Sequence, residues 1–207
     1  MTNPDALLKQ SGLVRLPRVG WIKDFVAYLA DRPKHPGHVG SRPRPGISHN
    51  KMSDVMTAPY FLDYARSFTP VASNYFGEQA HLWSLNAFYT NPDTPYVHGV
   101  NGLHSDREAN KILALFVLGY DTFQDGAQLI QTGPDKWDAL WGPAGTAWLA
   151  DTRIPHFGLI PKRPRMIAWA RWANCIPQAA IDENLPKVPE TNSFLTIENL
   201  GRIWREN

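Results

Sequence analysis

Residues 112–120 read ILALFVLGY, an unbroken apolar run far shorter than the ~18 residues that a membrane-spanning helix needs. A run of this length is typical of a central strand that is buried on both faces. HLWSLNAFY (81–89) alternates apolar residues with Ser84 and Asn86, as a half-buried strand does. Further short candidate strands are GAQLIQ, GTAWLAD, HFGLI and RMIAWARW, separated by the turn-like segments DTFQDG, TGPDKWDALWGPA and PKRP. The pattern predicts an antiparallel sandwich or barrel.

Helices are predicted ahead of these strands. Residues 19–31 carry one apolar helical face. Residues 58–67 favour a helix with Thr57 as cap and Pro59 in the first turn, and VASNYFG favours one that stops at Gly77. A short helix is expected at 193–206. We therefore expect a single domain over 1–207, with a mainly helical part (1–77), a β core (78–175) and a C-terminal extension (176–207).

The segment 32–51 interrupts the helical part. It is rich in proline, glycine and basic residues and contains His35, His38 and His49. Such a composition predicts a long loop. It could be a lid over a site or an exposed surface loop. It also allows a different class of function, a module that binds an anionic partner through Arg32, Lys34, Arg42, Arg44 and Lys51.

Composition narrows the class of protein. A hydrophobic content of 43% and an aromatic content of 12% are typical of a folded chain, and a net charge of +2 gives no reason to expect nucleic acid or a membrane as partner. The first residues, MTNPDALLKQ, lack a secretory signature, and the single Cys175 excludes an internal disulfide. We expect a cytoplasmic protein; its oligomeric state is open.

The residues with the clearest chemistry are His104 and Asp106, an H-x-D triplet with Ser105, and the distant His156. Side chains two apart on an extended segment point the same way and can share one metal ion. Two imidazoles and one carboxylate leave part of an octahedral Fe(II) open to substrate and O2. The alternative for His156 is a purely structural role, as a turn histidine after Pro155. The set predicts a non-haem Fe(II) oxygenase.

Three arginines follow His156. Arg165 and Arg171 share one face of the predicted strand 165–172, and Arg163 lies before a proline. A buried guanidinium needs an anionic partner, and it grips a carboxylate in bidentate fashion. A dicarboxylate co-substrate would supply that partner. The alternative is a basic surface on which all three arginines face solvent.

On these residues the chain resembles the Fe(II)/2-oxoglutarate-dependent dioxygenases, and within them the phytanoyl-CoA dioxygenase-like group. The resemblance covers about residues 55–173, including GLHSDREANKILALFVLGYD and GTAWLADTRIPHFGLIPKRPRMIAWARW. It implies a double-stranded β-helix (a cupin-like jelly roll) preceded by helices. The DGAQLIQTGPDKW segment is similar to the family's G-x-L-x-x-x-P-G-S-H stretch but lacks its Gly-Ser-His ending.

The resemblance implies roles for particular residues. His104, Asp106 and His156 would hold Fe(II); Arg165, or as second choice Arg163, would bind 2-oxoglutarate, with Arg171 as a helper. The reaction would consume O2, release succinate and CO2, and hydroxylate a C–H bond of a small molecule. Because Asp106 is present, where halogenating members have a small residue, hydroxylation is favoured over halogenation.

Other residues are weaker candidates for the substrate pocket. They are Asn86, Tyr89, Lys111 and Trp148, for which facing solvent or packing in the core is the alternative. A cupin-type metalloenzyme that does not use 2-oxoglutarate is the rival reading within the same fold. The identity of the substrate stays open.

Overall fold

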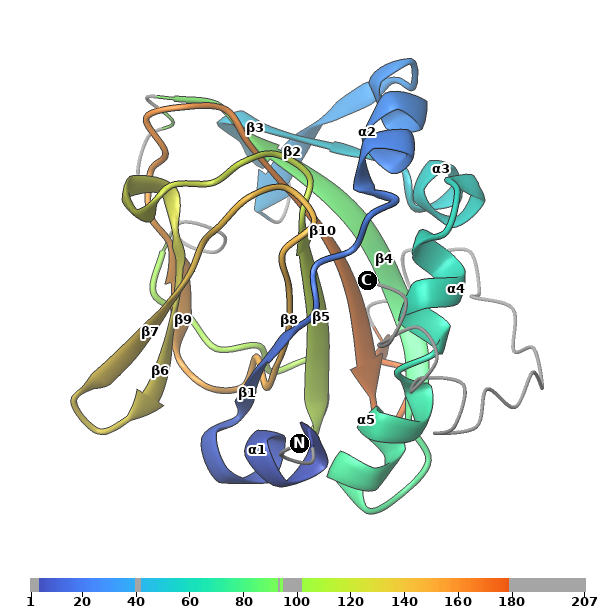
Figure 1. Cartoon of the computed structure of the whole chain (residues 1–207), viewed down its shortest axis with the longest axis vertical. Helices are drawn as coiled ribbons and strands as arrows, with labels where there is room; N and C mark the ends of the chain where they lie inside the picture. Colours follow the sequence, from blue (N-terminus) through green and yellow to red (C-terminus); the bar gives the residue numbers. More distant parts are fainter. Residues whose placement is uncertain (1–3, 40–41, 93, 95–101, 179–207) are drawn as a thin grey trace.

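The structure, a computed structural model, describes residues 4–39, 42–92, 94 and 102–178. Its strands pair into two antiparallel sheets (Figure 1). The larger sheet has, in spatial order, β1 (Leu13–Leu16), β8 (Ala147–Ala150), β5 (Ile112–Leu118), β10 (Arg165–Ala173), β4 (His81–Thr90), β3 (Arg42–Asn50) and β2 (Lys34–Val39). The smaller sheet has β7 (Lys136–Leu140), β6 (Gln128–Gly133) and β9 (His156–Gly158). The predicted antiparallel, mainly β core is confirmed.

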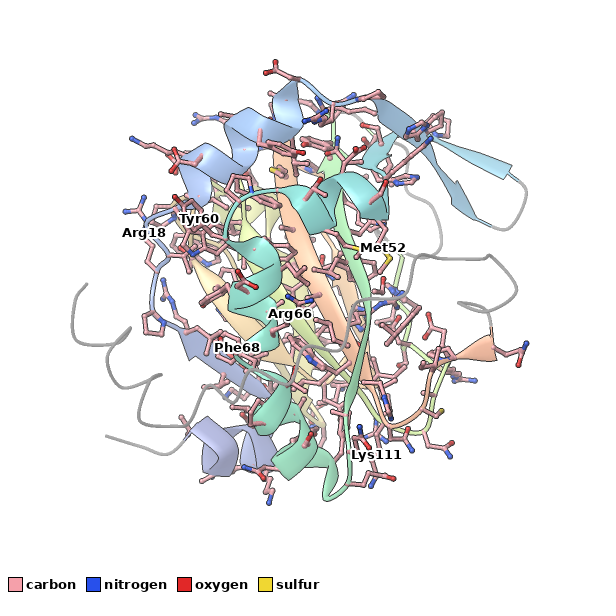
Figure 2. All side chains as sticks on the ribbon, turned by 90° about the vertical axis from the view of Figure 1, so that its right-hand side faces the viewer. Arg18, Met52, Tyr60, Arg66, Phe68 and Lys111 are labelled. Atoms are coloured by element: carbon pink, nitrogen blue, oxygen red, sulfur yellow. The ribbon has the colours of Figure 1, made fainter. Side chains whose placement is uncertain are left out.

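Helices cover the face of the larger sheet that points away from the smaller one (Figures 1 and 2). They are α1 (Pro4–Ser11), α2 (Ile22–Ala30), α3 (Met52–Thr57), α4 (Phe61–Arg66) and α5 (Thr69–Phe76), and a short 3-10 turn, η1 (Gln124–Gly126), follows later. The predicted helix near 19–31 is α2, which buries Ile22, Phe25 and Leu29. The predicted stop at Gly77 is confirmed, because Gly77 ends α5 in the left-handed conformation with φ 70°.

The helix predicted over 58–67 is wrong at its start. The residue before a proline avoids the helical region, and Ala58 is extended with ψ 143°. Tyr60 then takes a positive φ of 67°, so α4 begins only at Phe61. Thr57 is the last residue of α3 rather than a cap, and its hydroxyl donates to Ser53 O at 3.1 Å. The predicted helix at 193–206 lies outside the described residues.

The loop predicted at 32–51 is instead the hairpin of β2 and β3. β2 is an edge strand, and prolines are tolerated at sheet edges because one side of the strand needs no hydrogen-bond donor. The hairpin extends the larger sheet, since Ile47, Ser48 and His49 of β3 pair with β4. The segment TGPDKWDALWGPA, predicted as a turn, likewise contains strand β7, paired with β6.

The core has two main layers around β5. Leu113, Leu115 and Val117 pack toward the helices, whereas Ala114, Phe116 and Leu118 pack toward the smaller sheet. All seven residues of β5 are buried, which confirms the expectation of a strand buried on both faces. The side of the larger sheet that faces the smaller sheet is called the inner face below. Among the described residues, no helix is long and apolar enough to cross a membrane.

Candidate metal centre

His104 and His156 are brought together by backbone pairing. They form an isolated antiparallel bridge, in which His104 N–H donates to His156 O at 3.0 Å and His156 N–H donates to His104 O at 2.9 Å. Asp106 N–H donates to Thr152 O at 2.9 Å, which ties the same loop to the chain just before β9. Two segments about fifty residues apart in the sequence are therefore held side by side. The structure thus brings together all three predicted metal ligands.

One ligand atom from each of His104, Asp106 and His156 lies within 4.8 Å of the other two. Donor atoms about 2.0–2.2 Å from one metal lie about 3 Å apart when they take adjacent positions, so the three side chains would have to move closer together to bind one ion. Nε2 of His104 is 3.9 Å from Oδ1 of Asp106, and the two imidazole centroids are 4.2 Å apart. Two imidazoles and one carboxylate are the donor set that suits non-haem iron with open positions.

Backbone carbonyls set the tautomer of both histidines. His104 Nδ1 lies 2.6 Å from Gly102 O, and His156 Nδ1 lies 2.9 Å from Ile154 O. A carbonyl oxygen only accepts, so each Nδ1 carries the hydrogen and each Nε2 keeps its lone pair. Such carbonyl contacts are the usual support for metal-binding histidines. Burial lowers the pKa of His156, which favours the neutral ring that a metal requires.

Arg171 touches the carboxylate of the centre. Its Nη1 lies 3.4 Å from Asp106 Oδ2 and 3.1 Å from Glu108 Oε1. Its guanidinium lies over the rings of Trp83 and Trp169, at 4.4 and 4.3 Å from their centroids. Aromatic faces attract a cation and hold its plane in place. Arg171 is therefore an orienting partner of Asp106, closer to the centre than its predicted helper role.

Arg165 is buried on the inner face of β10, with 2% of its surface exposed. Its Nη1 donates to Gly126 O at 2.6 Å and to Leu159 O at 3.0 Å, and its Nη2 lies 3.5 Å from Thr90 Oγ1. Burial lowers the pKa of Arg165 to about 10, so the side chain keeps its charge at neutral pH. Leu159 is three residues past His156, so Arg165 is hydrogen-bonded to the segment that carries the distal histidine.

Arg163, the second candidate residue for binding 2-oxoglutarate, is not buried on the inner face as Arg165 is. It is exposed, and its guanidinium covers the ring of Phe123 at 4.3 Å, on the surface of the molecule. The register of β10 agrees with the prediction that alternate residues share one face. Met166, Ala168 and Ala170 pack toward the helices. The residues that alternate with them therefore face inward: Arg165, Ile167, Trp169 and Arg171.

The four pocket candidates divide into two pairs. Asn86 pairs with Trp169, and Trp148 packs with Phe116 between the sheets, so both face inward. Tyr89 faces the helices, where its hydroxyl donates to Asn50 Oδ1 at 2.9 Å. Lys111 lies at the end of the sheet near α5, paired with Glu78 at 2.7 Å (Figure 2). Asn86 and Trp148 therefore lie on the inner face, whereas Tyr89 and Lys111 make their contacts on the helical side and at the end of the sheet.

Two residues of the site were missed from the sequence. Glu108 extends H-x-D to H-x-D-x-E, a spacing that could have indicated it. Trp83 was expected to alternate with Leu85, Ala87 and Tyr89 on one face. A bulge changes this, because Arg171 pairs with Ser84 while Trp172 pairs with Leu82, so Trp83 has no partner in β10. No local sequence signal predicts that bulge.

No protein-family model and no curated protein matches the chain. Solved structures do match the chain. An oxidoreductase of the 2OG-Fe(II) oxygenase family from Burkholderia pseudomallei aligns with a TM-score of 0.65 at 15% identity, covering 84% of this chain and 89% of its own. A prolyl-4-hydroxylase from Pseudomonas putida aligns with a TM-score of 0.62 at 14% identity, covering 82% and 96%.

A third similar structure holds ligands. The epimerase SnoN of nogalamycin biosynthesis, solved with Fe3+, alpha ketoglutarate and nogalamycin RO, aligns with a TM-score of 0.59 at 14% identity, covering 93% of this chain and 90% of its own. At these identities the likeness establishes the fold. The chain has the double-stranded β-helix, or jelly roll, found in the 2-oxoglutarate and iron oxygenases, preceded by helices as predicted. Its His-Asp-His set has the donors that iron takes in such enzymes.

Proposed function

We propose that the protein is an Fe(II)- and 2-oxoglutarate-dependent oxygenase that hydroxylates a C–H bond of a small molecule, with release of succinate and CO2. The convergence of His104, Asp106 and His156 within 4.8 Å carries the proposal. A jelly roll alone would not, because one fold serves many functions. Iron and the co-substrate, once bound, would supply the oxidising chemistry that amino-acid side chains lack.

The protein residues bind and orient. His104 and His156 offer Nε2 lone pairs, fixed by the carbonyls of Gly102 and Ile154. Asp106 supplies the negative charge that offsets part of the metal's charge, and Arg171 restrains its carboxylate. Asp106 would also take one coordination position of the metal, which supports hydroxylation over halogenation.

Arg165 fits the distal carboxylate of 2-oxoglutarate. It is a buried cation on the inner face, and it donates to the carbonyls of Gly126 and Leu159. A guanidinium in a dry setting binds a carboxylate by charge-assisted hydrogen bonds. Bound 2-oxoglutarate would thus be held between the metal and strand β10.

Further parts of the proposal rest on the sequence. The segments quoted above support placement in the phytanoyl-CoA dioxygenase-like group. We place the protein in the cytoplasm, where reducing conditions would preserve Fe(II) and the exposed thiol of Cys175. A small-molecule substrate is in keeping with a centre in which Asp106 and His156 are buried while His104 is partly open to solvent.

The test is an anaerobic titration with Fe(II) and 2-oxoglutarate, followed by visible absorption. A weak charge-transfer band that needs both additions is the expected result. Asp106→Ala should abolish it. Asp135→Ala removes an exposed carboxylate in the turn before β7 and is the matched control, which should keep the band.

Two results would point elsewhere. Metal binding without any spectral response to 2-oxoglutarate would favour the cupin-type metalloenzyme. A protein that binds no metal, yet binds an anionic polymer with steep salt dependence, would favour the binding module at 32–51.

A further inference from the structure

We propose that one half of the inner face is a subsite for a neutral aromatic ring that carries a hydroxyl or N–H group. The subsite is formed by Asn86 and Phe88 of β4, Ile167 and Trp169 of β10, and His49 of β3. This inference names the substrate class of the proposed oxygenase, and so rests on the proposed function.

Strand register puts these five side chains on one face. Trp169 pairs directly with Asn86, Ile167 pairs with Phe88, and Phe88 pairs with His49 on its other side. Residues directly opposite each other in antiparallel strands point to the same side of the sheet. The five therefore form one continuous surface across three neighbouring strands.

This surface differs in burial from the adjoining half of the inner face. There, Phe116 and Trp148 are 8% and 4% exposed, because Ile130 and Leu140 of the smaller sheet pack over them. All five subsite residues are instead half-buried. Phe88 belongs to none of the hydrophobic clusters found among the described residues. Such partly exposed rings, unlike core aromatics, have surface left for a ligand.

The opposite face of the same strands shows no such exposure. Ala87 and Ala168, which alternate with the subsite residues, are both 0% exposed against the helical layer. Partial exposure is therefore specific to the inner side. It is not a property of these two strands as a whole.

The surface is continuous with the metal centre. The guanidinium of Arg171 lies 4.3 Å from the Trp169 ring centroid and 3.4 Å from Asp106 Oδ2. From Trp169 the rings continue edge to face to Phe88, at 5.2 Å and 71°, and on to His49 at 5.8 Å. A planar ligand packed on Trp169 and Phe88 would therefore lie next to the guanidinium that restrains Asp106.

Polar groups at the edge define what the ring should carry. His49 Nδ1 lies 3.1 Å from Asn50 O, which only accepts, so His49 Nε2 is left as an acceptor. Asn86 Oδ1 accepts from Ala87 N–H at 2.8 Å, so its amide N–H groups remain as donors. None of the five residues is acidic or carries a fixed positive charge. A neutral ring with one donor group matches this set.

The test compares 2-naphthol with its saturated counterpart, decahydro-2-naphthol. Binding is measured by ligand NMR on the protein loaded with Mn(II) and 2-oxoglutarate, where paramagnetic relaxation also reports the distance from probe to metal. We expect 2-naphthol to bind more tightly than decahydro-2-naphthol, and we expect its NMR signals to relax strongly because the bound ring lies near Mn(II). Phe88→Leu should weaken the binding of 2-naphthol by about twofold to tenfold, because that is the usual contribution of one aromatic pair. His49→Phe should abolish the preference for 2-naphthol over naphthalene.

Trp137→Leu is the matched control, since Trp137 is 39% exposed and packs on Phe157 of the smaller sheet. It should leave binding unchanged, and thermal midpoints would verify that every variant is folded. Equal binding of the saturated probe, no binding of 2-naphthol, or no effect of Phe88→Leu in a folded protein would overturn the subsite. If the Fe(II) and 2-oxoglutarate band is nevertheless seen, the proposed function stands without it. Absence of that band overturns the function itself.

Discussion

Nη1 of Arg171 lies 3.4 Å from Oδ2 of Asp106, so a residue near the end of β10 restrains a proposed metal ligand in the loop before β5. The Trp83 and Trp169 rings on either side hold the guanidinium in that position. The carboxylate thus depends for its orientation on a strand that is far away in the sequence.

Replacing Arg171 with Gln should weaken metal binding. Residues that orient a metal ligand typically contribute about 10- to 100-fold in affinity, and we expect a loss in that range. Titration with Fe(II) or Co(II) under anaerobic conditions measures it. Arg163→Gln removes an exposed arginine and should leave the affinity as it is. A folded Arg171→Gln protein with unchanged metal affinity would contradict the orienting role.

Replacing Arg165 with Gln should weaken 2-oxoglutarate binding and leave metal binding nearly intact. Hydrogen bonds to charged groups contribute about 1.5–3 kcal/mol, so we expect the dissociation constant to rise by roughly 10- to 150-fold. The charge-transfer band, titrated with 2-oxoglutarate, reports that constant. Arg163→Gln again serves as the control. If only Arg163→Gln weakened binding, the co-substrate would sit near Phe123 instead.

A metal ion bound by His104, Asp106 and His156 should stabilise the folded protein. A ligand at 100 times its dissociation constant stabilises the native state by about 2.7 kcal/mol, and a chelator removes that gain. Differential scanning calorimetry with and without Fe(II) measures the shift in the thermal midpoint. In His156→Ala the shift should vanish. A shift that survives in this variant would place the metal elsewhere.

Gly77→Ala should destabilise the chain by about 1 kcal/mol. A Cβ at Gly77 meets no atom within 4 Å, so the cost comes only from its left-handed φ of 70°. Gly20→Ala is the comparison, because Gly20 also has open space around it and has no positive φ. Urea unfolding of both variants separates backbone strain from steric clash. Equal stability of the two would show that Gly77 ends α5 without strain.

Much of the fold follows from local pattern. The apolar run at 112–120 and the alternation at 81–89 predict β5 and β4, because strand side chains alternate between faces and a doubly covered strand has no polar face. Gly77 predicts the end of α5 for a backbone reason that acts within one turn. The hairpin of β2 and β3 could not be predicted, since Pro36 is compatible with pairing because β2 is an edge strand, and edge position is a property of the whole sheet.

The sequence by itself determined which residues can supply the chemistry: the H-x-D triplet, the later histidine, and two arginines six positions apart on one strand face. Tertiary structure decided which of them meet. Pairing of His104 with His156 closes the centre, a bulge beside Arg171 leaves Trp83 to cover its guanidinium, and burial separates Arg165 from the exposed Arg163. These contacts join strands distant in sequence, and strand periodicity carries no information about which strands become neighbours.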